Sequence, residues 1–194
     1  MLRGMVFMDH MNFDIELQRH YTAIGERTPK LDYSKMFNAI AKSKETDFLK
    51  AFIFAPEPDG FLVNDEKLLK NFKWLQGMAN AKYTDVIFGR YVARPTKEGV
   101  QMDISDRGTY YKVEKGTDIN LAINLLSKAQ YNSYDIAFVM SADTDYINVY
   151  RLLKSMGKIV VAVALKGQNL KKVIPEVDDY IMLDKTFFDK CIRS

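Results

Sequence analysis

Hydrophobic residues along this chain fall into two patterns, short unbroken apolar runs and longer stretches in which apolar residues recur at helical spacing. Unbroken runs are typical of strands that are covered on both faces of a parallel sheet. They predict strands at residues 4–8, 48–55, 85–94, 109–113, 136–140, 158–164 and 180–183. Pro56 and Pro95 stop two of these strands, because proline has no N–H to donate to a neighbouring strand.

The stretches between the strands predict helices. Helical spacing of apolar residues indicates helices at residues 13–27, 33–42, 65–81, 117–129 and 145–156, and a short helix is expected at the end of the chain. Thr117 is the expected N-cap of its helix, and residues 100–104 are interpreted as a small hairpin partner. Because strands and helices alternate, the predicted fold class is α/β, with residues 1–194 forming a single Rossmann-like domain whose mostly parallel sheet is flanked by helices.

Composition limits the classes of protein that fit this pattern. The chain has 194 residues, 47% of them apolar, which suits one domain with an ample core. Its 28 basic and 25 acidic residues give a net charge of +3, too mild to identify a nucleic-acid-binding protein. One cysteine and two histidines argue against disulfides and structural zinc, and they suggest a reducing, cytoplasmic location. No apolar run is long enough to span a bilayer, and the N-terminus does not resemble a signal peptide, so no membrane association is expected.

Carboxylates follow two of the predicted strands at the point where each strand ends. Asp143 and Asp145 come after residues 136–140, and Asp9 comes directly after residues 4–8. Taken alone, the first pair fits helix capping slightly better than catalysis. Two parallel strands that deliver acids to one carboxyl edge, where α/β sheets bind ligands, favour a functional site instead. Paired carboxylates of this kind suit a hard cation such as Mg²⁺.

A further acid, Asp118, lies in the first turn of the helix predicted at residues 117–129, where the positive end of the helix already explains a carboxylate. Three short motifs of the chain occur in one order: Asp9-x-x-Asn12, Lys115-Gly116-x-Asp118 and Ser141-x-Asp143-x-Asp145. This ordered set, with its matching strands, resembles the NYN domain, a branch of the PIN-like nucleases. The resemblance extends from residue 5 to about residue 183.

The resemblance implies a Rossmann-like (PIN-like) sheet with an acidic metal site and, in many members, cleavage of RNA. The catalytic and metal-binding residues it implies are Asp9, Asp118, Asp143 and Asp145. Asp9, Asp143 and Asp145 are expected to bind Mg²⁺ or Mn²⁺ directly or through water, and Asp118 to act as a ligand or as a base that orients water. A metal-bound water then supplies the nucleophile, so no nucleophilic side chain is required.

Substrate is expected to approach the same edge through positive charge. The substrate-binding candidates are Asn12, Lys115, Ser141, Lys166, Lys171 and Lys172. The lysines lie in or just after predicted loops at that edge, where their positive charge suits contact with a phosphate backbone. A solvated surface position explains any single one of them as well. Tyr146 and several other tyrosines are candidates for stacking on bases, although the aromatic content requires most of them to be buried.

The chain departs from the family pattern at three positions. Asn124 stands where the family often carries a further Asp, Ala142 replaces a common Gly, and His10 replaces a small residue. Asparagine binds a cation through its carbonyl oxygen but brings no charge, which weakens a second metal position more than the first.

Three classes of function therefore remain open. The leading hypothesis is a metal-dependent endoribonuclease with RNA as its partner. The alternative is a catalytically weak or inactive regulatory protein that binds RNA or a nucleotide, which Asn124 favours. A phosphatase-like hydrolase with Asp9 as nucleophile ranks last, because Met11 occupies the position of its usual second acid. Apolar residues on the surface could support a homodimer, but the sequence does not locate an interface.

Overall fold

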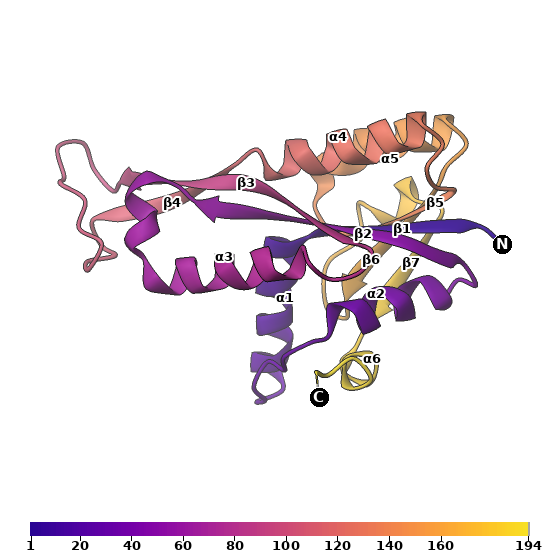
Figure 1. The fold of residues 1–194 in the computed structure, drawn as a ribbon, viewed down its shortest axis with the longest axis horizontal. Coiled ribbons are helices and arrows are strands. Elements are labelled where there is room, and N and C mark those ends of the chain that lie inside the picture. Colours follow the sequence, from indigo (N-terminus) through magenta and orange to yellow (C-terminus); the bar gives the residue numbers. More distant parts are fainter. Residues whose placement is uncertain (194) are drawn as a thin grey trace.

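The computed structural model describes residues 1–193 as a twisted sheet with helices on both faces (Figure 1). Ser194, the last residue of the predicted domain, lies outside the described residues. The strands are β1 (Arg3–Asp9), β2 (Asp47–Pro58), β3 (Thr84–Pro95), β4 (Tyr110–Lys115), β5 (Ile136–Met140), β6 (Ile159–Leu165) and β7 (Asp179–Leu183). The α-helices are α1 (His10–Ala23), α2 (Tyr33–Lys42), α3 (Glu66–Met78), α4 (Thr117–Gln130), α5 (Ile147–Ser155) and α6 (Lys185–Asp189). Short 3₁₀ helices are η1 (Gly60–Asn64), η2 (Thr144–Tyr146) and η3 (Ile174–Glu176).

The seven strands form one sheet in the order β4-β3-β2-β1-β5-β6-β7. Every neighbouring pair is parallel except β3 and β4. This arrangement confirms the predicted α/β class with a mostly parallel sheet. None of the helices in residues 1–193 is long and apolar enough to cross a membrane.

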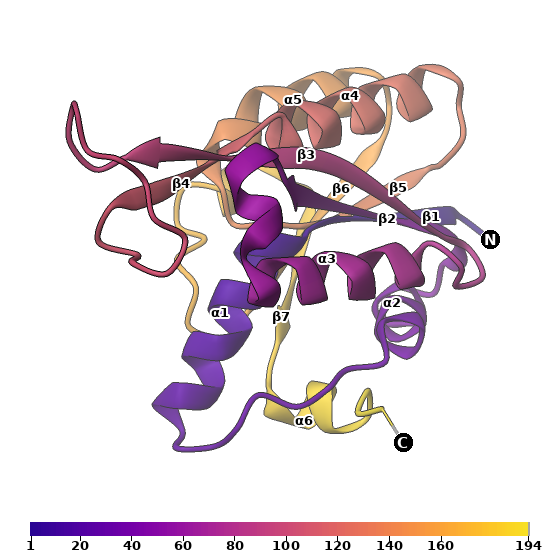
Figure 2. The same cartoon turned by 60° about the vertical axis from the view of Figure 1, so that its left-hand side comes forward.

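Helices cover the sheet on both faces, which explains why its central strands are almost wholly apolar. One face, called the α1 face below, is covered by α1, α2, α3 and α6, and the other, the α4 face, by α4 and α5 (Figures 1 and 2). In β1, Val6 and Met8 pack into the core of the α1 face, while Met5 and Phe7 pack into that of the α4 face. Because side chains alternate along a strand, Asp9 is directed toward the α4 face.

The strands β2, β3 and β4 extend beyond the end of β1. The last residue of β1, Asp9, pairs with Phe54 of β2. β2 continues past this point, and β3 continues past β2 as residues 92–95, which pair only with β4. We call this two-stranded part the projecting ribbon, and Figure 1 shows it at the left of the molecule. Tyr91 at its base and Tyr110, which pairs with Pro95 at its far end, form a small buried cluster with Leu62.

Two local predictions are wrong. Residues 100–104 are not a strand but a loop in which an isolated bridge joins Asp103 and Asp106. Asp103 accepts hydrogen bonds from the backbone N–H and the hydroxyl of Ser105, and such local bonds compete with strand pairing. Thr117 is the first residue of α4 rather than its N-cap. The cap is Gly116, whose φ of 83° is accessible to glycine.

Candidate active site at the carboxyl edge of the sheet

The direction in which the sheet grows reverses at β1. The strands β2 and β3 lie on one side of β1, and β5, β6 and β7 lie on the other. The carboxyl ends of the two strands at such a reversal are where α/β sheets bind ligands. Asp9 ends β1 and Ser141 directly follows β5, so two of the three acidic motifs meet at this point.

Asp9 is buried at this edge, with 6% of its surface exposed. Its carboxylate accepts a hydrogen bond from the backbone N–H of Asn12 at 3.0 Å, which makes Asp9 the N-cap of α1. The Ser141 hydroxyl donates to the other carboxylate oxygen at 3.4 Å. Burial above all raises the pKa of Asp9 to about 6, and the charges of Glu114 and Asp118 contribute to the rise. A carboxylate in this state is stabilised by a cation or by a proton.

The Ser141 hydroxyl connects Asp9 to the loop that carries Asp143. Ser141 is buried, and its oxygen also accepts a hydrogen bond from the backbone N–H of Asp143 at 3.2 Å. Asp143 in turn accepts from the backbone N–H of Asp145 at 2.9 Å and is the N-cap of η2. Asp143 is therefore a helix cap, as the simpler interpretation of the sequence has it. Asp9 is a helix cap as well, which the sequence analysis did not predict, and both residues lie at the same edge.

Asp118 joins this group through Tyr146. The Tyr146 hydroxyl donates to Asp118 Oδ1 at 2.8 Å, and the ring is buried rather than free to stack on a base. Burial raises the pKa of Tyr146, and the negative charges of Asp9, Asp118 and Asp143 raise it as well. Tyr146 thus contacts Asp118 directly and feels the negative charge of two further carboxylates from separate segments of the chain. We call Asp9, Asp118, Asp143 and Tyr146 the acidic group.

Two glycines place Asp118 at the edge. β4 runs antiparallel to β3 and returns the chain to the carboxyl edge, where α4 begins. Gly89 of β3 lets this turn pack directly against the strand, because a Cβ at Gly89 would lie 2.7 Å from both the Lys115 carbonyl oxygen and the Thr117 backbone nitrogen. Gly116 completes the turn with its positive φ.

Comparison with known proteins identifies the family of this fold. The NYN domain family matches residues 3–184, nearly the whole chain. The chain belongs to the NYN domain family. Among solved structures, a crystal structure of a protein of unknown function from Vibrio parahaemolyticus is similar over 99% of this chain and 96% of that chain, with a TM-score of 0.62 and 16% sequence identity. At that identity the similarity supports the fold alone. No curated protein matches the chain.

Glu114 of this NYN domain lies beside the acidic group, although the sequence motifs do not include it. It is partly buried near the end of β4, and burial raises its pKa, with the charge of Asp118 adding to the rise. The same charge of Glu114 contributes to the raised pKa of Asp9. The sequence marks Glu114 only by its position two residues before Gly116. That position indicates a site residue only when β4 is known to return the chain to the carboxyl edge.

The remaining predicted residues lie further out. Asp145 is exposed on η2, and its hydrogen bond to Asp143 comes from the backbone rather than from its carboxylate. The predicted substrate-binding lysines are all exposed, one at the end of β4 and three in the segment after β6: Lys115, Lys166, Lys171 and Lys172. In the sheet, β4 lies on one side of β1 and β5, and β6 lies on the other. Lys115 therefore lies on one side of the acidic group and the other three lysines lie on the opposite side.

Asn12 connects the segment after β6 to this edge. Its Oδ1 accepts hydrogen bonds from the backbone N–H of Ala142 at 3.4 Å and from Gln168 Nε2 at 3.3 Å. Gln168 Oε1 in turn accepts from the backbone N–H of Leu165 at 2.7 Å. Asn12 thus positions the loops after β5 and β6 relative to β1.

Asn124 stands at the position where the family often has Asp, and its side chain makes its hydrogen bonds within α4. Its Nδ2 donates to the Asn120 carbonyl oxygen at 2.9 Å, and its Oδ1 accepts from Lys128 Nζ at 2.8 Å. Both polar atoms of the side chain are used inside the helix, so Asn124 is separate from the acidic group.

The donors at this edge are carboxylate, amide and hydroxyl oxygens, which are the ligands that Mg²⁺ and Mn²⁺ prefer. Their concentrated negative charge and the raised pKa of Asp9 also fit a cation. Within residues 1–193, no three acidic, histidine or cysteine side chains are close enough together to form a ready-made metal site. A cation at this edge would therefore complete its oxygen ligands with water and with phosphate oxygens of a substrate. The residues thus fit a divalent cation in chemistry and charge.

Proposed function

We propose that this NYN domain, residues 1–194, is a metal-dependent endoribonuclease that hydrolyses RNA phosphodiester bonds at the carboxyl edge of its sheet. The observation that carries the proposal is the gathering of carboxylates at one edge of the sheet, where Ser141 connects Asp9 to the Asp143 loop and Tyr146 contacts Asp118. Helix capping accounts for Asp9 and Asp143, whereas Asp118, in the first turn of α4, makes the additional contact with a buried tyrosine. The proposal also agrees with the family, since NYN domains are generally PIN-like nucleases.

The proposed cofactor is Mg²⁺ or Mn²⁺, held by Asp9, Asp118 and Asp143, with Asp145 acting through water. Such an ion lowers the pKa of a bound water and stabilises negative charge on the phosphoryl oxygens. Ser141 and Asn12 hold the loops that carry these ligands, by the hydrogen bonds described above.

Glu114 is the residue we propose for proton transfer beside the metal ligands. Its raised pKa brings a carboxylate closer to the range in which it accepts a proton from water and later releases it. Asp118 remains the second candidate for this role, because its carboxylate is held in place by the Tyr146 hydroxyl.

RNA is the proposed substrate, and lysines on both sides of the acidic group are proposed to contact its phosphates. Lys115 approaches from the end of β4, while Lys166, Lys171 and Lys172 approach from the segment after β6. The proposed location is the cytoplasm, where the buried Cys191 stays reduced. No feature of residues 1–193 supports the homodimer that the sequence leaves open.

The test is cleavage of labelled single-stranded and structured RNAs with Mg²⁺ or Mn²⁺, by the wild type and by Asp143→Asn. Asparagine retains an oxygen that caps η2 but removes the charge, so the fold is expected to persist. Asp47→Asn is the matched control, because Asp47 is exposed at the start of β2, at the opposite edge of the sheet.

We expect metal-dependent cleavage that falls by about a hundredfold or more in Asp143→Asn and is unchanged in Asp47→Asn. Equal loss in both variants, or cleavage that continues in a chelator, would refute the proposal. RNA binding without cleavage in the wild type would instead establish the alternative, a regulatory RNA-binding protein.

A further inference from the structure

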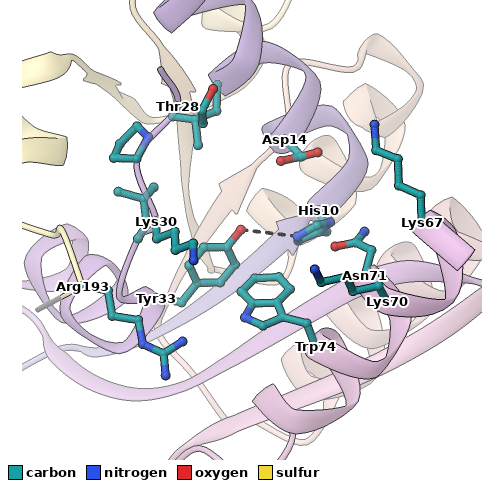
Figure 3. A pocket seen from close by; sticks show the side chains of 13 residues that line it. His10, Asp14, Thr28, Lys30, Tyr33, Lys67, Lys70, Asn71, Trp74 and Arg193 are labelled. Atoms are coloured by element: carbon teal, nitrogen blue, oxygen red, sulfur yellow. Dashed lines mark hydrogen bonds between the residues drawn. The ribbon is translucent and has the colours of Figure 1, made fainter. Parts of the chain in front are cut away.

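A second polar site lies among helices of the α1 face (Figure 3). Asp9 of the acidic group is directed toward the opposite face of the sheet. The second site is a cavity of about 440 Å³ between α1, the segment that joins α1 to α2, and α3. This volume lies in the range of small-molecule sites, roughly 300–1,000 Å³. We call it the α1–α3 cavity.

Four cationic side chains surround the α1–α3 cavity. Figure 3 shows Lys30 and Arg193 on one side and Lys67 and Lys70, one turn apart on α3, on the other. Among residues 1–193, none of these four forms an ion pair. The lining contains a single carboxylate, Asp14. Cations in such excess around a concave surface attract an anion.

Aromatic rings form the wall between the cations. Trp74 is partly exposed, whereas Tyr33 and His10 behind it are buried. The rings of Tyr33 and Trp74 meet edge to face with centroids 5.5 Å apart, and the His10 ring lies 5.9 Å from Trp74. Tyr33 Oη and His10 Nε2 are 3.3 Å apart, while His10 Nδ1 has no hydrogen-bond partner among the described residues. Trp74, the exposed ring of this wall, thus offers an aromatic surface to a planar ligand, and the buried Tyr33 and His10 support it.

Contacts between distant segments hold this cavity in shape. An isolated bridge joins Leu31 to Ile192, and the backbone N–H of Arg193 donates to the Lys30 carbonyl oxygen at 2.9 Å. The backbone N–H of Asp32 donates to the Cys191 carbonyl oxygen at 2.8 Å. Two of the four cations are therefore carried by backbone that is fixed without any ligand, as a preorganised site requires.

We propose that the α1–α3 cavity binds one ribonucleotide, with its base against Trp74 and its phosphate among the four cations. Charge accounts for the phosphate, and the aromatic wall accounts for a base, because stacking on an aromatic ring tolerates every base. Asp14 Oδ2 accepts from Gln18 Nε2 at 2.7 Å, which leaves Oδ1 as an acceptor for a ribose hydroxyl or a base N–H. A simple inorganic anion would use only the cations and leave the aromatic wall without a role.

Such a nucleotide has two sources. It is either a free nucleotide or one nucleotide of an RNA strand that passes over the carboxyl edge, and the second source rests on the function proposed above. Asp9 and His10 are consecutive residues, so the acidic group and the cavity lie on either side of the junction between β1 and α1.

Trp74 makes the test direct, because it is the only tryptophan in the chain. Its fluorescence is titrated with the four nucleoside 5′-monophosphates, inorganic phosphate and a short oligoribonucleotide, all in a chelator so that cleavage plays no part. The same titrations use the double variant Lys67→Ala/Lys70→Ala and the control Lys73→Ala, which removes an exposed lysine of the same helix that does not line the cavity.

We expect a saturable change in Trp74 fluorescence whose midpoint rises about tenfold or more in the double variant and stays unchanged in Lys73→Ala. A response to monophosphates assigns the free nucleotide, and a response to the oligoribonucleotide alone assigns a nucleotide within a strand. No saturable response, an equal effect of Lys73→Ala, or equal affinity for inorganic phosphate would overturn the proposal.

The outcome is separable from that of the nuclease test. Asp143→Asn, which disables the acidic group, should give the wild-type fluorescence titration. Cleavage without a fluorescence response would overturn the cavity proposal alone, and a fluorescence response without cleavage would overturn the nuclease proposal alone.

Discussion

The acidic group and the α1–α3 cavity begin at neighbouring residues and have opposite chemistry. Asp9 is the last residue of β1, and the alternation of side chains along this strand directs it toward the α4 face, where it lies near Asp118 and Asp143. His10 begins α1 and lines a cavity surrounded by cations on the other face. One residue step at the end of a strand therefore separates a place that suits a metal cation from one that suits an anion. The net charge of +3 conceals this, because it sums the two regions.

The two regions also differ in how their charges are held. The carboxylates of the acidic group accept hydrogen bonds from backbone N–H groups and hydroxyls, which fix each carboxylate in one place. The lysines around the cavity are exposed and make no ion pair within residues 1–193. Rigid anions suit a small cation with strict geometry, whereas long mobile cations suit a larger anion whose position varies.

Asp9→Asn should separate the two regions most strongly. We expect cleavage to fall by about a hundredfold or more, because the variant loses a central charge of the acidic group. The nucleotide titration of Trp74 should match the wild type, since the cavity opens on the other face. Parallel assays of cleavage and fluorescence test this, and a similar loss in both would mean that the two regions are one site.

The same variant should change stability with a definite dependence on pH. The pKa of Asp9 rises from 3.8 to about 6 on folding, so its ionised form costs on the order of 3 kcal/mol above that pH. Without divalent cation, Asp9→Asn should therefore raise the free energy of unfolding at about pH 7.5. The gain should vanish as the pH falls through about 6 toward 4, because the folded wild type then takes up the proton before the unfolded chain does. Urea unfolding at both pH values measures this, and an equal gain at both would contradict it.

Gly89→Ala should damage the acidic group through the backbone. The new Cβ would lie 2.7 Å from the Lys115 carbonyl oxygen, so the turn that places Asp118 must shift. We expect a loss of about 1–3 kcal/mol in the free energy of unfolding and weaker cleavage, with the cavity titration unchanged. Gly77→Ala is the control, because a Cβ there meets nothing within 4 Å, and as a helical position it should stabilise α3 by roughly 0.5–1 kcal/mol. A Gly89→Ala protein as stable as the wild type would show that the turn is not tightly packed.

Asn124→Asp should have the smallest effect. Lys128 already donates to Asn124 Oδ1, so a carboxylate there forms an ion pair within α4, but the hydrogen bond from Asn124 Nδ2 to the Asn120 carbonyl oxygen is lost. The gain from the ion pair, about 0.3–0.5 kcal/mol, is offset by that loss, so we expect stability and cleavage to stay close to the wild type. Thermal unfolding and the cleavage assay check both. A large gain in cleavage would mean that this position belongs to the acidic group after all.

The sequence predicts where the strands end better than it predicts how the strands pair and in which direction they run. Asp9 and Asp143 follow unbroken apolar runs, which leaves little choice of strand or of edge. Glu114 was not predictable in the same way, because its role depends on the antiparallel return of β4, and the sequence of β4 does not state its direction. A long loop rather than a tight hairpin turn joins the paired residues Pro95 and Tyr110, so no short turn motif gives the pairing of β4 with β3.

The α1–α3 cavity is beyond sequence patterns for a related reason. Lys30 and Arg193 are at opposite ends of the chain and meet through a backbone hydrogen bond. Periodicity describes which face of an element is buried, but it does not state which loops lie against each other. Trp74 reads as one more apolar residue of α3 until its neighbours are known.

The projecting ribbon has a consequence for the dynamics of the site. Residues 92–95 pair only with β4, whereas β1 has a hydrogen-bonded neighbour on each side and is covered on both faces. Amide protons of the ribbon should therefore exchange with solvent through local opening, while those of β1 and β5 exchange only when the whole core unfolds. Because β4 leads directly into α4, such opening would loosen Glu114 and Asp118 while leaving Asp9 and Asp143 in place. One side of the acidic group is thus anchored in the most protected part of the molecule and the other in a part that opens on its own.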